Sequence, residues 1–124
     1  MDAREELQRA YEHDSAGREE EAVVHYRRAF ALGVPDDELA SASLGFGSTL
    51  RNVGEIAESI RVLEDAVARF PEHAALRVFL AYALWSSERP ADAMRSLVDA
   101  FYVGDTRPEL VRYERAIRGY ADEL

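Results

Sequence analysis

Apolar side chains recur every three or four residues along almost the whole chain, the spacing that one face of an α-helix produces. The clearest instance spans 55–70, where Ile60, Leu63 and Val67 follow the turn residue Gly54 and the stretch ends at Pro71. The pattern predicts seven helices, at about 1–15, 19–32, 38–52, 55–70, 74–86, 90–103 and 107–121. No segment alternates with the period of a strand, so we expect an all-α fold.

Three segments of the chain carry the same order of small and large residues. By subtraction, equivalent positions lie 37 residues apart between the first two segments and 34 apart between the last two. The equivalent sets are Ala10, Gly47 and Ala81; Ala22, Ser59 and Ala93; Tyr26, Leu63 and Leu97; Ala29, Ala66 and Ala100; and Phe30, Val67 and Phe101. We expect the small residues to let paired helices approach closely, while Tyr26, Leu63 and Leu97 fill the space between segments.

This repeat, with two antiparallel helices per unit, resembles the tetratricopeptide repeat, in its small three-repeat bacterial type. The resemblance implies one domain, a right-handed α-α superhelix with units at about 3–36, 40–73 and 74–107 and a capping helix at about 107–121. Three extra residues near Asp37 are expected to lengthen the third helix by almost one turn. Glu88 stands where the other units have the turn residues Gly17 and Gly54.

Helix ends and faces add detail to this arrangement. Asp36 or Asp37 could cap the third helix, and Thr106 with Glu109 forms a capping box for the seventh. The fifth helix is apolar nearly all round, which is typical of a helix between neighbours. The seventh helix has one apolar stripe and charged residues on its other faces, as expected for the helix that ends a stack. That stripe comprises Leu110, Tyr113, Ile117 and Tyr120.

Composition narrows the class of activity. The formal net charge is −9 and all 15 cations are Arg, so the balance is unfavourable for a general nucleic-acid binder or an anionic membrane surface. The chain has no cysteine, which excludes disulfides and thiolate chemistry. No apolar run is long enough to span a bilayer, and the first residues do not resemble a secretory signal, so we expect a cytoplasmic protein.

Nothing in the sequence indicates a catalytic, metal or cofactor site. His13, His25 and His73 have no partner at metal-ligand spacing. The run 45–48 superficially suggests a phosphate loop, but it lacks the strand and the Gly-Lys-Ser/Thr that such a loop needs. The carboxylates cluster at helix starts, where capping and solvation explain them.

The resemblance also implies that the first helix of each unit lines a concave face. The candidate partner-binding residues on that face are Leu7, Tyr11, Leu44, Ser48, Arg51, Val78, Tyr82 and Trp85. The tyrosines and the tryptophan are of the type that anchors interfaces, and Arg51 could pair with a carboxylate. Alternatively, the C-terminal helix covers some of the aromatic residues. The Lys, Asn and Arg clamp by which some cochaperones of this family hold chaperone tails has no counterpart here.

We therefore interpret the chain as a non-catalytic scaffold that binds a protein or peptide on its concave face. The alternative is a structural, self-associating protein whose exposed helix face forms a homodimer while the concave face stays idle. An enzyme would need a deep polar pocket, which no feature of the sequence indicates.

Overall fold

The computed structural model describes residues 1–105 and 107–124, and these residues form helices and turns without a strand. Eight helices lie in the described part of the chain. They are α1 (Ala3–Ser15), α2 (Glu19–Leu32), α3 (Asp36–Asn52), α4 (Ile56–Arg69), α5 (Ala74–Ser86), α6 (Pro90–Ala100), α7 (Arg107–Arg112) and α8 (Glu114–Asp122). The all-α prediction is confirmed. The third helix has 17 residues against 13 in α1 and α5, as the three extra residues predicted.

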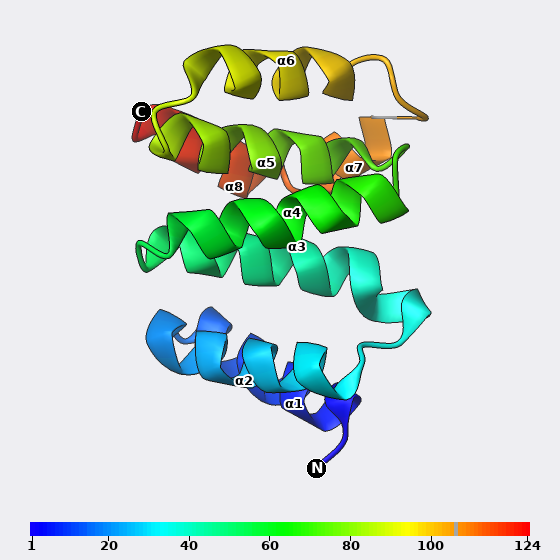
Figure 1. Ribbon diagram of the computed structural model, residues 1–124, viewed down its shortest axis with the longest axis vertical. Helices are drawn as coiled ribbons and strands as arrows, with labels where there is room; N and C mark the ends of the chain where they lie inside the picture. Colours follow the sequence, from blue (N-terminus) through cyan, green and yellow to red (C-terminus); the bar gives the residue numbers. More distant parts are fainter. Residues whose placement is uncertain (106) are drawn as a thin grey trace.

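The first six helices form three antiparallel hairpins that follow one another along the long axis of the molecule (Figure 1). The turn within each hairpin has the same hydrogen bond, in which the residue after the turn donates its N–H to a carbonyl five residues back. The three bonds run from Arg18 to His13, from Glu55 to Leu50 and from Arg89 to Leu84. Each turn also has one residue with positive φ, which is Gly17, Gly54 or, in the third hairpin, Glu88 at +63°.

The hairpins pack closely, internally and against each other, where a small residue of the repeat meets a large one. Gly45 lies directly against Tyr26 of the preceding hairpin, and Gly47 lies against Leu63 of its own hairpin. Tyr26 and Leu63 are each only 1% exposed, so the prediction that these two residues fill the stack is confirmed. Within the described residues, every buried side-chain nitrogen and oxygen has a hydrogen-bond partner.

The matching prediction for Leu97 is wrong, because its side chain is 38% exposed. Tyr26 and Leu63 are covered by the hairpin that follows each of them in the stack. After α6 the chain turns back, and α7 and α8 pack on α5 instead of continuing the stack beyond α6. The outer side of α6 is therefore left uncovered at one end of the molecule (Figure 1).

The C-terminal segment forms two helices where one was predicted. The break falls at Tyr113, whose φ of −105° and ψ of 12° depart from helical values. With this bend, both Tyr113 and Tyr120 reach the ring of Phe79 on α5, at 6.1 and 6.0 Å between centroids. The predicted capping box begins at Thr106, which lies outside the described residues. Glu109 accepts a hydrogen bond from the backbone N–H of Ala75 at 3.0 Å and so helps to cap α5.

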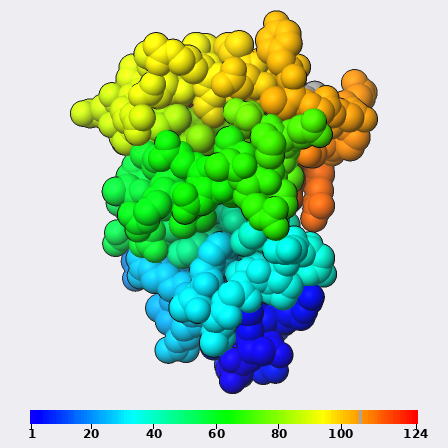
Figure 2. Space-filling model, turned by 45° about the vertical axis from the view of Figure 1, so that its right-hand side comes forward, coloured from blue at the N-terminus to red at the C-terminus, as the bar shows by residue number. Residues whose placement is uncertain are grey.

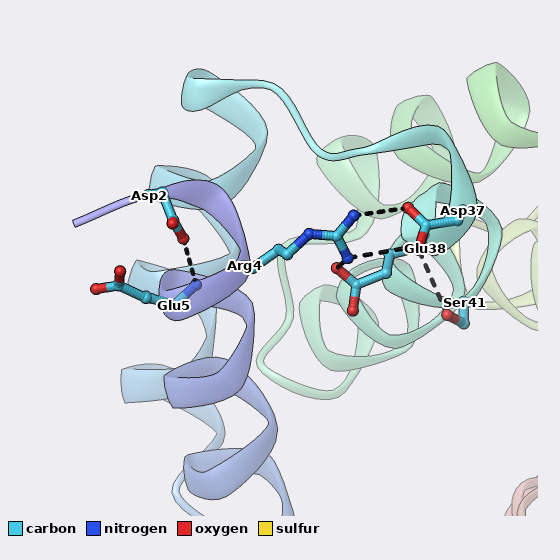
Figure 3. A network of polar contacts seen from close by, with 6 residues as sticks. All are labelled: Asp2, Arg4, Glu5, Asp37, Glu38 and Ser41. Carbon is cyan, nitrogen blue, oxygen red and sulfur yellow. Dashed lines mark hydrogen bonds and ion pairs between the residues drawn. The ribbon is translucent and has the colours of Figure 1, made fainter.

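An ion-pair network joins the first hairpin to the second (Figure 3). The guanidinium of Arg4 on α1 lies 3.0 Å from the carboxylate of Asp37 and 2.9 Å from that of Glu38. The predicted cap at Asp36 or Asp37 is not formed, because α3 starts at Asp36 itself and Pro35 occupies the cap position. The acidic residues in the first turn of α3 instead interact favourably with the positive end of the helix dipole. Asp37 and Glu38 also form ion pairs with Arg4 of the first hairpin.

Candidate functional site

The helices α1, α3 and α5 are neighbours, because α3 contacts α5 and side chains of α1 bond to side chains of α3. We call the side of the stack that these three helices form the inner face. The space-filling view shows the hairpins in sequence order, with the start of the C-terminal segment (orange) at the right-hand edge of the stack (Figure 2). The C-terminal helices cover part of the inner face, and the predicted residues fall into three groups by exposure. Leu7, Leu44, Val78 and Tyr82 are buried; Tyr11, Ser48 and Arg51 are partly buried; Trp85 is 49% exposed. Only the last two groups are open to a partner in this conformation.

Three different sets of neighbours bury the first group. Leu44 packs in the core cluster that also contains Leu63 and Leu76. Leu7 packs inside the first hairpin, beside Ala10 and Tyr26. Val78 and Tyr82 pack instead with Ile117 and Tyr120 of α8. The C-terminal helix thus lies over the α5 side of the inner face, which is the arrangement that the alternative interpretation of the aromatic residues anticipated.

Tyr120 is the centre of the contact between α8 and the inner face. Its hydroxyl lies 3.0 Å from the hydroxyl of Ser48 and accepts a hydrogen bond from the amide of Asn52 at 3.1 Å. Its ring meets that of Tyr82 edge to face, with 5.7 Å between centroids. One aromatic side chain is therefore held by polar groups of α3 and by aromatic rings of α5.

Arg51 lies at the edge of this cluster. Its guanidinium carbon is 5.6 Å from the ring centre of Tyr82 and 5.3 Å from that of Tyr120, within the range of cation–π attraction. Its Nε donates to the hydroxyl of Ser86 at 2.9 Å and to the carbonyl of Tyr82 at 3.3 Å. Among the described residues no carboxylate pairs with Arg51, so its positive charge is balanced by rings and dipoles alone.

Tyr82 binds the C-terminal helix directly, because its hydroxyl donates to the backbone carbonyl of Ile117. Burial raises the pKa of the Tyr82 hydroxyl, and the nearby charge of Arg51 opposes that rise. The hydroxyl therefore stays protonated and available as a donor at neutral pH. This bond ties the end of the Tyr82 side chain to the backbone of α8.

Two other tyrosines, Tyr11 on α1 and Tyr26 on α2, lie in the N-terminal half of the stack. Tyr26 donates to the carboxylate of Asp14 at 3.2 Å, and Thr49 donates to the same carboxylate oxygen at 3.2 Å. Burial, followed by the charge of Asp14, raises the pKa of Tyr26 well above its usual range. Burial, followed by the charge of Glu38, also raises the pKa of Tyr11. Both phenols are therefore neutral groups of the stack and do not form a charged site.

The structure brings together two histidines from consecutive helices, His13 of α1 and His25 of α2. The rings of His13 and His25 stack with 5.2 Å between centroids, and His25 Nδ1 lies 2.7 Å from the buried carboxylate of Glu6. Arg18 donates to His13 at 2.8 Å. Within the described part of the chain, no group of three or more His, Asp or Glu side chains is placed to hold a metal ion. The cluster instead links α1 to α2.

Sequence reasoning missed the role of Tyr120, Asn52 and Phe79 in the site. The stripe that carries Tyr113, Ile117 and Tyr120 was visible in the sequence, but the surface that it covers was not. Periodicity identifies which face of a helix is apolar. It does not say whether that face packs on α6, as a further unit would, or on α5, as it does here.

These observations define an α-α superhelix built from three stacked helical hairpins, with the C-terminal segment packed on the inner face. A family model described as tetratrico peptide repeat matches residues 4–124, and the chain belongs to this family. A search of curated proteins finds no match to the chain. Tetratricopeptide repeat proteins serve in general as scaffolds for protein interactions, and they are generally non-catalytic. None of the described helices is both long and apolar enough to cross a membrane.

Proposed function

We propose that this protein is a non-catalytic binding module that receives a segment of another polypeptide on its inner face. The observation that supports the proposal is the cluster around Tyr120. Here Ser48, Asn52, Arg51 and Tyr82 hold an aromatic side chain from a segment that follows the repeats. A surface that binds one helix of its own chain in this way has the chemistry to bind a similar helix from a partner.

The contacts also indicate which features a partner would need. An aromatic residue would take the place of Tyr120 between α3 and α5. A carboxylate beside it would meet Arg51, which has no anionic partner among the described residues. Trp85, 49% exposed at the end of α5, would extend the apolar contact. We therefore propose an amphipathic helix with an aromatic and an acidic residue on the same face as the ligand.

In this proposal α8 competes with the partner. No residue of α7 or α8 is fully buried, so the apolar side chains that hold the segment stay partly open to solvent. Partial release of α8 would expose Tyr82, Val78 and Phe79. A ligand then has to bind more tightly than the segment that it displaces, which lowers its apparent affinity for the complete chain.

Capture experiments with two variants test the proposal. Tyr120→Ala removes the anchor of α8, so it should retain partner proteins more strongly than the wild type does. The matched control Tyr120→Ala/Arg51→Glu also reverses the charge at the edge of the site and should lose those partners. If both variants retain the same proteins in the same amounts, the inner face is not the binding site.

Self-association is a second candidate function, and a specific observation favours it. The outer side of α6 carries large exposed apolar residues, and this surface is separate from the inner face.

A further inference from the structure

Helix α6 presents a complete apolar stripe to solvent at the end of the stack. The stripe consists of Met94, Leu97, Val98, Phe101 and Tyr102, which are 59%, 38%, 44%, 66% and 85% exposed. Their spacing of i, i+3, i+4, i+7 and i+8 places them on one side of the helix and its C-terminal turn. The opposite side of α6 is already packed, since Ala93, Ser96 and Ala100 are buried.

Two residues of this stripe are equivalent to residues that are buried between hairpins in the first two units. Met94 is equivalent to Val23 and Ile60, which are 4% and 8% exposed. Leu97 is likewise equivalent to Tyr26 and Leu63, each 1% exposed. These positions are apolar in the first two units because another hairpin covers them. In the third unit they remain apolar although α7 and α8 pack elsewhere.

The rest of the stripe is more apolar than an internal hairpin requires. Val98 occupies the position of Arg27 and Glu64, which are exposed and charged. Tyr102 occupies the position of Ala31 and Ala68, which are also exposed. Stacking of a further hairpin does not explain a large apolar residue at these two positions. They indicate a contact surface that the first two units do not have.

We propose that the α6 stripe is a homodimer interface, in which α6 of one copy packs antiparallel on α6 of a second copy. A two-fold axis between Leu97 and Val98 would set Leu97 opposite Val98 of the second copy. The same axis sets Met94 opposite Phe101. Antiparallel pairing of one helix with its own copy closes the assembly at two chains.

The net charge around the α6 stripe supports a second copy of this chain as its binding partner. The whole chain carries −9, yet 89–102 contain Arg89 and Arg95 against Asp92 and Asp99, a net charge of zero. Repulsion between two acidic chains is therefore small at this surface. In the antiparallel pairing, Arg95 also lies next to Asp99 of the second copy. Asp99 is 62% exposed and has only a long, 3.8 Å contact with Arg77.

A head-to-tail arrangement is disfavoured by the other end of the stack. The exposed residues of α1 are all polar, namely Arg4, Glu5, Gln8, Arg9, Glu12 and Ser15. Helix α1 therefore offers no apolar surface to meet the α6 stripe, and α2 exposes only Val24 and Leu32 as large apolar residues, eight positions apart. Burying the stripe in both copies removes on the order of 1,000 Å² from water, the lower end for a specific interface. The dimer should therefore be reversible, with a Kd on the order of 10 μM.

Sedimentation of the complete chain over a concentration series tests this dimer. From about 5 to about 500 μM the wild-type mass should rise from the 13.9 kDa of one chain towards twice that value. Phe101→Glu/Tyr102→Glu should weaken association at least about tenfold, because it places charges in the interface. Leu32→Glu changes a residue that is 57% exposed on α2 and should associate as the wild type does. Melting curves confirm that each variant is folded.

A cross-link tests the orientation independently, because the chain has no cysteine. Val98→Cys lies near the proposed axis and should form a disulfide-linked dimer under mild oxidation, whereas Leu32→Cys should not. A wild type that stays monomeric over the whole series would overturn the proposal, as would a Phe101→Glu/Tyr102→Glu variant that associates like the wild type. Neither result bears on the inner face, whose residues are unchanged.

Discussion

Gly47 and Leu63 lie so close together that a side chain on the glycine cannot be accommodated. A Cβ built on Gly47 would be 2.5 Å from Cγ of Leu63. The hydroxyl of Ser59 also donates to the carbonyl of Gly47 at 2.7 Å, which fixes α4 against α3. The approach of the two helices in the central hairpin therefore depends on a residue that by itself disfavours a helix.

Gly47→Ala should lower the free energy of unfolding by about 1–3 kcal/mol, since overpacking outweighs the better helix propensity of alanine. Gly119→Ala in α8 is the matched control. A Cβ there meets nothing within 4 Å, so this substitution should stabilise the chain by up to about 1 kcal/mol. Urea denaturation of the two variants measures both effects. Equal changes in stability would show that the helices separate more easily than the structure indicates.

Leu63→Ala and Leu97→Ala compare equivalent positions of the second and third hairpins. Leu63 is 1% exposed, so its truncation should cost about 2–5 kcal/mol through lost burial and a cavity. Leu97 is 38% exposed and should cost less than about 1 kcal/mol in the dilute, monomeric protein. Denaturation at low protein concentration checks the difference. Similar costs would mean that α6 is covered in the monomer.

Some of this architecture could be predicted from the sequence and some could not. The ranges predicted for α2 and α5 match the structure because strong periodicity and clear turn residues bound them. The exposure of Leu97 was not predictable from its repeat position, since it depends on where the following segment packs. The break at Tyr113 was missed for the same reason, because contacts with α5 accompany it and no Pro or Gly marks it.

The candidate site was predicted in part. Arg51 and Ser48 were identified from their places in the repeat, and the structure brings them together at Tyr120. Val78 and Tyr82 were also named, but α8 buries them. Contacts between segments far apart in the sequence decide which segment covers a given helix face. The residue pattern within one helix does not contain that information.

Glu88 is the only described residue other than glycine with a positive φ, at +63°. Replacing it with glycine removes the strain of a side chain in this conformation, but it also increases the freedom of the unfolded chain. Glu88→Gly should therefore raise the free energy of unfolding modestly, by up to about 1 kcal/mol. Gly54→Ala, at a φ of +89° in the equivalent turn, should have the opposite effect. A thermal melt of each variant compares the two turns.

The buried tyrosines predict a loss of stability at high pH. Burial, followed by the charge of Asp14, raises the pKa of Tyr26 above the ordinary 10.0. A raised pKa in the folded state means that its contribution is complete below about pH 10 and declines as the pH rises further. Phenolate absorbance should show that Tyr11, Tyr26 and Tyr82 ionise later than an unfolded control, with unfolding at alkaline pH.

Tyr26→Phe provides the control for this titration. It should remove one late-ionising phenol while leaving the other two in place. A single transition near pH 10 for all six tyrosines of the folded chain would contradict the burial of these hydroxyls.

The proposed role of the inner face depends on whether it binds a helix in trans. The most direct measurement is the affinity of a synthetic peptide of residues 107–124 for the complete chain. In the wild type, the attached C-terminal helix competes at a high effective concentration. In Tyr120→Ala this competition is weakened, so we predict that the peptide binds the variant at least about tenfold more tightly than it binds the wild type. Equal affinities for the two proteins would contradict a polypeptide-binding site on this face.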